Sequence, residues 1–147
     1  MAPLIVLAVS ILVFWLAGRA GVTPFQDADF VLRAGLAAMF ALTASAHWGK
    51  RRPDLIRMVP PVFPRPDLLV TVTGILEILG VIGLLLPPTA RASCICLAVL
   101  LAAMFPANVR AAREHMTIAG QAVPGVAARA AIQVVFLAVL AAAAWLK

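Results

Sequence analysis

The sequence predicts an all-α fold, a polytopic bundle of transmembrane helices with a four-helix core and one extra N-terminal helix. Two observations carry this prediction. The 147 residues are 64% hydrophobic and only 12% charged, with a mean hydropathy of +1.06, whereas soluble domains carry about 25% charged residues. The apolar residues also gather in five segments, each close to the roughly 20 residues that a helix needs to cross the hydrocarbon core. We therefore expect one transmembrane domain over residues 1–147, embedded in a lipid bilayer.

The expected spans are approximately residues 2–18, 29–49, 67–86, 91–108 and 125–146. The first segment carries no charge, and a cleaved signal peptide is the alternative interpretation. No Lys or Arg precedes its apolar core, which argues against cleavage. Arg33 interrupts the second segment and Glu77 the third, while Pro124 marks the expected start of the fifth helix.

The two longest links differ in character. In the link from Lys50 to Asp67, Pro53 and Asp54 are expected to begin a short helix, because both suit a first helical turn. This link mixes apolar and basic residues, a pattern typical of a segment lying among lipid headgroups. The link from Glu114 to Arg129 is expected to be a turn-rich connection.

The net charge of +6 arises mainly from Lys and Arg in these links, and we assign it to anionic headgroups and not to nucleic acid. With five spans, eight of the twelve Lys and Arg residues fall on the side of the N-terminus and of the second and fourth links. Positive residues favour the cytoplasmic side. The sequence thus predicts a cytoplasmic N-terminus.

Glu77 is the principal candidate site residue. It is the only acidic residue of the 23-residue apolar run from Leu68 to Ala90. A carboxylate near the membrane midplane costs at least about 2.5 kcal/mol, so it must be neutral, paired or near water. Gly74, Gly80 and Gly83 surround it and would let neighbouring helices approach closely. Such a residue is a proton acceptor, a ligand-binding carboxyl or a helix-packing contact.

Arg33 is the expected charge partner of Glu77. It lies in the second span, about 10 Å from the level of Glu77 by helical rise, a gap that two long side chains can largely close. The alternative is that its guanidinium reaches the outer headgroups.

Further polar residues fall at stepped depths between Glu77 and the inner surface, and they predict a polar track that carries protons or admits a polar headgroup. Each also has a structural interpretation, since membrane Thr bonds its own helix and the His-Trp pair suits an interface. Helical rise places Glu77 and His47 about 10 Å apart along the membrane normal. The residues of this track are Thr73, Thr43, Gln133, His47, Trp48 and Asn108.

Metal and disulfide chemistry find little support. No metal-ligand spacing of His, Cys or carboxylates is present. Cys94 and Cys96 lie two residues apart in a predicted helix, where their side chains point away from each other and cannot form a disulfide.

Several motifs together resemble the DoxX-like family of small bacterial integral membrane proteins, over about residues 28–146. They are Thr43-Ala44-Ser45-Ala46-His47-Trp48, Ile56-Arg57-Met58-Val59-Pro60-Pro61, Thr73-Gly74-Ile75-Leu76-Glu77-Ile78-Leu79-Gly80 and Phe105-Pro106-Ala107-Asn108-Val109. The resemblance implies a four-helix core in a bacterial inner membrane and a link to membrane redox systems that use quinone. The two cysteines depart from the paired cysteines expected of the redox branch.

Three functions remain open at this point. The leading hypothesis is a DoxX-like component that binds a quinone or another small hydrophobic molecule at Glu77, with Arg33 balancing its charge and His47 and Asn108 lining the inner mouth. The second is a non-catalytic subunit of a homo- or hetero-oligomer, in which Glu77 is a packing contact. The third is a membrane isomerase with Glu77 and His47 as an acid–base pair.

Overall fold

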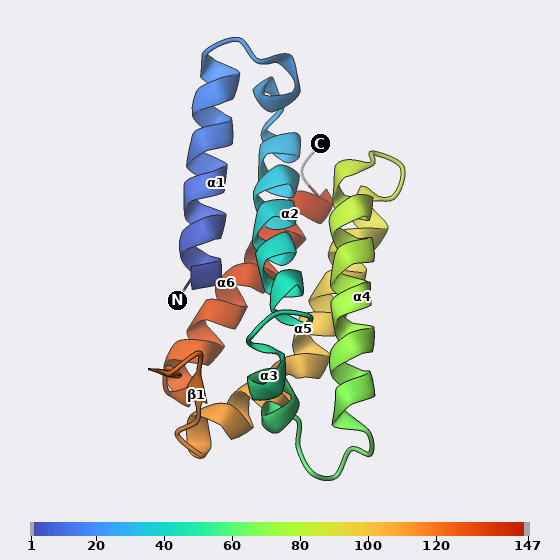
Figure 1. Ribbon diagram of the computed structural model, residues 1–147. Helices are drawn as coiled ribbons and strands as arrows, with labels where there is room; N and C mark the ends of the chain where they lie inside the picture. Colours follow the sequence, from blue (N-terminus) through green and yellow to red (C-terminus); the bar gives the residue numbers. More distant parts are fainter. Residues whose placement is uncertain (1, 146–147) are drawn as a thin grey trace.

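The computed structural model describes residues 2–145 and is a bundle of helices (Figure 1). Five of these helices are long and apolar enough to cross a membrane, which confirms the predicted all-α transmembrane bundle. They are α1 (Ala2–Arg19), α2 (Ala28–Ala46), α4 (Pro66–Leu85), α5 (Ala90–Arg113) and α6 (Val126–Trp145). Short elements join them: η1 (Thr23–Gln26), α3 (Arg52–Met58), β1 (Thr117–Ile118) and β2 (Gln121–Ala122).

The helix bounds follow proline and cap signals. Pro66 occupies the first turn of α4, which ends just before Pro87 and Pro88. In contrast, α5 passes through Pro106 and ends at Arg113, five residues beyond the expected end of that span. The last expected residue of the fifth span, residue 146, lies outside the described part of the chain.

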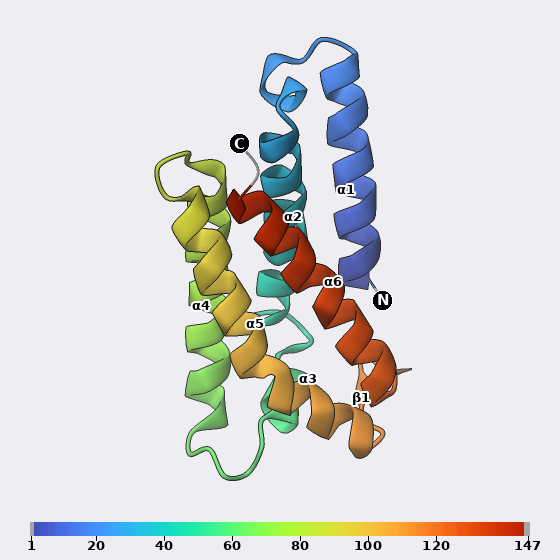
Figure 2. The same cartoon turned by 180° about the vertical axis from the view of Figure 1, so that it is seen from behind.

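Helices α2, α4, α5 and α6 form the core of the bundle, and α1 packs along α2 (Figures 1 and 2). Small residues set the close approaches. A Cβ at Gly80 would lie 2.5 Å from Leu97 of α5, and a Cβ at Gly35 would lie 2.5 Å from Ile11 of α1. The helices therefore touch at these levels, as expected of membrane bundles that associate through small residues.

The two ends of the bundle carry different elements. The lower end in Figure 1 holds α3, the hairpin and the links that flank them, whereas the upper end holds η1 and the α4–α5 turn. Eight basic residues lie in α3, in the links beside it and at the adjoining ends of α5 and α6: Lys50, Arg51, Arg52, Arg57, Arg65, Arg110, Arg113 and Arg129.

The predicted short helix forms, and the predicted turn-rich link has turns and also a short hairpin. Helix α3 has Pro53 and Asp54 in its first turn, as expected. The last link, however, contains an antiparallel hairpin in which Thr117 pairs with Ala122. Its two turn residues, Ala119 and Gly120, both have positive φ, as a tight two-residue hairpin requires.

Candidate functional site

Glu77 lies on the buried face of α4 and is only 2% exposed. Val70, Gly74 and Gly80 share this face, because residues three and four apart lie on one side of a helix. The carboxyl group therefore points into the protein and away from lipid, so its polar groups must be satisfied by protein.

The carboxyl group meets two side chains from the end of α2. Oγ1 of Thr43 lies 2.8 Å from Oε2 of Glu77, at hydrogen-bond distance. Nε2 of His47 lies 3.8 Å from the same oxygen. These two atoms thus lie much closer than the about 10 Å that helical rise predicts along the membrane normal. Helical rise measures backbone depth, whereas both side chains reach toward each other across the α2–α4 contact.

The backbone of α4 fixes the orientation of the imidazole. Nδ1 of His47 lies 2.6 Å from the carbonyl oxygen of Val70. A carbonyl oxygen only accepts hydrogen bonds, so Nδ1 carries a hydrogen and donates it. Thr73 lies beside this contact, with Oγ1 3.4 Å from Nδ1, and donates to the carbonyl oxygen of Leu69. Nε2 is consequently the ring nitrogen that faces Glu77.

Gly74 makes this arrangement sterically possible. A Cβ at this position would lie 2.7 Å from Cβ of His47 and 2.7 Å from the indole of Trp48. The imidazole thus packs against the α4 backbone one turn below Glu77. Trp48 packs beside it and remains about half exposed.

Arg52 of α3 holds the end of α2 in place, and the sequence interpretation missed it. Its guanidinium donates to the carbonyl oxygen of His47 at 2.8 Å, to Oγ1 of Thr71 at 2.9 Å and to the carbonyl oxygen of Asp67 at 3.1 Å. The available signal was its position just after a helix end, where basic side chains bind free carbonyls. Arg52 extends the polar contacts from the His47 backbone toward the lower end.

Arg33 is not the partner of Glu77. Its guanidinium lies 2.7 Å from Oδ2 of Asp29, one turn earlier in α2, and donates to the carbonyl oxygen of Leu84 at 3.3 Å. Only 6% of Arg33 is exposed, so protein covers its side chain. A carboxylate four residues away on the same helix is a nearer partner than Glu77 on another helix.

The hydrogen bonds of Asn108 and Gln133 likewise go to residues other than Glu77. Asn108 accepts a hydrogen bond from Arg129, and Gln133 donates to the carbonyl oxygen of Leu101 at 3.2 Å. Both bonds join α5 to α6. The structure therefore brings together Glu77, His47, Thr43 and Thr73 of the predicted residues, and assigns Asn108 and Gln133 to helix bridging.

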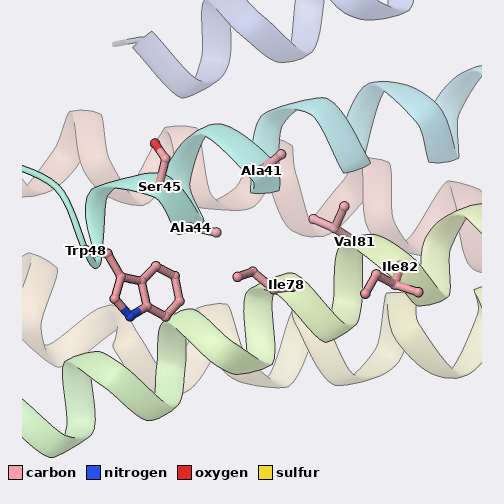
Figure 3. A pocket seen from close by; sticks show the side chains of 7 residues that line it. All are labelled: Ala41, Ala44, Ser45, Trp48, Ile78, Val81 and Ile82. Atoms are coloured by element: carbon pink, nitrogen blue, oxygen red, sulfur yellow. The ribbon is translucent and has the colours of Figure 1, made fainter.

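An apolar groove runs along the outer side of the α2–α4 contact (Figure 3), with a volume of about 350 Å³. Ala44 and Ile78, which line it, are the chain neighbours of Thr43 and Glu77. A second groove of about 340 Å³ shares Ala41 and Val81 with it and extends toward the upper end. Glu77 and His47 line neither groove. The lining residues of the first groove are Ala41, Ala44, Ser45, Trp48, Ile78, Val81 and Ile82.

One comparison with known proteins gives a match. The family model of a domain of unknown function (DUF8561) matches residues 36–146, a segment that contains Thr43, His47 and Glu77 but neither α1 nor Arg33. No curated protein and no solved structure matches the chain.

Proposed function

The chain belongs to the DUF8561 family, and we propose that it is a membrane component that binds a small hydrophobic molecule beside Glu77. The cluster of Thr43, His47 and Glu77 carries the proposal, because a buried ionisable group at membrane depth marks a functional site by default. The resemblance to DoxX-like proteins supports a quinone as the ligand, in a bacterial inner membrane with a cytoplasmic N-terminus.

The α2–α4 groove suits the apolar part of such a ligand. Its volume lies within the 300–1,000 Å³ of typical ligand pockets, and apolar side chains line it almost throughout. Its lining includes Ala44 and Ile78, the chain neighbours of Thr43 and Glu77. A ligand whose tail occupies the groove would reach Glu77 with a polar oxygen once the side chains of this lining part.

The short distance between Glu77 and His47 favours one further candidate, a membrane enzyme such as an isomerase that uses them as an acid–base pair. General acid–base catalysis needs both groups within hydrogen-bond reach of one substrate. A separation of 3.8 Å between Nε2 and Oε2 meets this requirement.

Native mass spectrometry of the protein released from lipid nanodiscs tests the proposal. We expect the wild type to retain a small hydrophobic molecule and the Glu77→Leu variant to lose it. Glu114→Leu is the matched control, because Glu114 is the other glutamate of the chain and lies at the exposed end of α5.

A second pair of variants tests the groove. Ala41→Leu should fill it and expel the ligand, whereas Ala103→Leu on the exposed face of α5 should have no effect. Retention of the ligand by both Glu77→Leu and Ala41→Leu would overturn the proposal. A different outcome would identify an assembly subunit instead: the wild type carries no small molecule but stays bound to a protein partner, and Glu77→Leu dissociates from that partner.

A further inference from the structure

The hydroxyl group of Thr43 has more acceptors than it can serve. Its oxygen lies 3.0 Å from the carbonyl oxygen of Phe40 and 2.8 Å from Oε2 of Glu77. A threonine hydroxyl has a single hydrogen to donate and two lone pairs that accept. If Glu77 were a carboxylate, one of these two oxygens would receive no hydrogen from Thr43.

A proton on Glu77 resolves this shortage. A protonated carboxyl group donates to Oγ1 of Thr43, and Thr43 then donates its own hydrogen to the carbonyl oxygen of Phe40. The three oxygens form a chain in which every hydrogen has an acceptor. This neutral form also avoids a buried charge, which is costly in the interior of a membrane protein.

The imidazole is consistent with the same assignment. Nδ1 of His47 carries its hydrogen toward Val70. If Nε2 also carried a hydrogen, the cation would need an acceptor for it, and the Oε2 atom of Glu77 lies 3.8 Å away, beyond the 2.7–3.2 Å of such hydrogen bonds. The other charged group in contact with His47 is Arg52 of α3, which binds the backbone carbonyl oxygen of His47 and offers no acceptor for a ring hydrogen.

We propose that Glu77 rests as a neutral carboxylic acid that donates a hydrogen bond to Thr43. In this state Nε2 of His47 is an unprotonated nitrogen that is free to accept a proton. The pair holds one acidic proton, and transfer breaks the O–H bond at Oε2 and forms an N–H bond at Nε2. This step leaves a carboxylate and an imidazolium and requires the two atoms to approach by about 1 Å.

The assignment also defines a class of ligand, and in this respect it rests on the proposed function. Once the Glu77 acid turns its single hydrogen away from Thr43, a ligand hydroxyl group can bridge the two residues, because it donates to Nε2 of His47 while it accepts from the acid. A methyl ether of the same shape accepts but cannot donate. Alcohols and phenols are therefore the polar groups that the site recognises, and of a quinone it is the reduced quinol form, a diphenol, that fits this description.

Solid-state NMR of the protein in bilayers, near neutral pH, tests the proton assignment without any ligand. The chain has two histidines and two glutamates, and His115 and Glu114 are exposed. Isotope labelling of these two residue types thus yields one buried and one reference signal each. We expect His47 protonated at Nδ1 alone and Glu77 with the carboxyl signal of an acid. A Glu77 carboxylate, or a His47 without a hydrogen on Nδ1, would overturn the assignment.

Two substitutions test the part played by Thr43. In Thr43→Val the acid loses its acceptor and should turn to Nε2, whose resonance then shifts toward that of a hydrogen-bonded imidazole. Thr43→Ser keeps the hydroxyl and should leave the resonance unchanged. An unshifted Nε2 resonance in folded Thr43→Val protein would contradict the assignment. If Thr43→Val does not fold, the wild-type spectra alone decide the assignment.

The ligand class has a separate readout. An alkylphenol should perturb the His47 and Glu77 signals, and its methyl ether should perturb them at least tenfold more weakly at equal concentration. Equal effects of both probes would overturn the ligand class while leaving the proton assignment intact. No effect of either probe would count against the proposed binding function itself.

Discussion

The carbonyl oxygen of His47 accepts a hydrogen bond of 2.8 Å from Arg52, and this bond joins α3 to the end of α2 that carries the imidazole. The same guanidinium binds Thr71 and the Asp67 carbonyl of α4. Arg52 therefore holds the two helices of the site in register at their lower ends.

Removing this guanidinium should destabilise the protein. We expect Arg52→Ala to lower the free energy of unfolding by about 1–3 kcal/mol, because hydrogen bonds from a charged donor are lost. Equilibrium unfolding in mixed micelles measures the change. Arg51→Ala is the control, since no hydrogen bond of its side chain appears among residues 2–145. Equal losses in both variants would refute the role of Arg52.

Gly74→Ala should separate α2 from α4. The added Cβ would meet His47 and Trp48 at 2.7 Å, and overpacking of this kind costs about 1–3 kcal/mol. Gly125→Ala is the matched control, because a Cβ there meets nothing within 4 Å. The intrinsic tryptophan fluorescence, with Trp15 and Trp145 replaced by Phe so that Trp48 alone reports, and the unfolding free energy should both change in Gly74→Ala only.

The buried pair of Arg33 and Asp29 should behave as a structural unit that is independent of Glu77. Arg33→Met leaves the Asp29 carboxylate unpaired and should cost about 3 kcal/mol, near the low end for such pairs because Asp29 is 19% exposed. The double variant with Asp29→Leu should recover most of the loss. Ligand retention should be unaffected in the double variant, and its loss there would restore Arg33 to the site.

Gln133→Leu should have a small effect. Its hydrogen bond to the Leu101 carbonyl joins α5 to α6, and interhelical bonds of this kind contribute about 0.6–1.7 kcal/mol. The unfolding free energy should decrease by an amount within this range, and the variant should retain its bound ligand. A variant of normal stability that has lost the ligand would contradict the helix-bridging assignment.

The hairpin should detach from α3 in acid. The backbone N–H of Ala119 donates to Asp54 and, with Arg57 beside the same carboxyl group, holds the pKa of Asp54 below its ordinary value. A lowered pKa in the folded state means that this contact stabilises the fold above the ordinary carboxyl pKa of about 3.9 and is lost as pH falls below it. The protection factor of the Ala119 amide against hydrogen exchange should fall there, and Asp54→Ala should show this lower protection at every pH.

The helices were predictable because each is a long apolar run between charges, and the burial of Glu77 was predictable from the glycines that share its helix face. The partners were harder to predict. Arg33 had a competitor at Asp29 on its own helix, and depth along a helix axis did not show that His47 reaches Glu77.

Two other features left weak signals. In helices that are apolar on all sides, periodicity does not show which face packs inward, so Asn108 and Gln133 could not be told from site residues. The hairpin turn places Ala119 at a positive φ, a conformation that glycine adopts readily and alanine rarely adopts, so the sequence did not indicate this turn.

Gly74, which has no side chain, also limits how α2 and α4 can shift relative to each other. A slide of α4 along α2 by one helical turn would bring Val70 or Glu77, which share this face, to the level where only Gly74 leaves room for the imidazole ring. Gly74 thus fixes the relative height at which the two helices of the site meet.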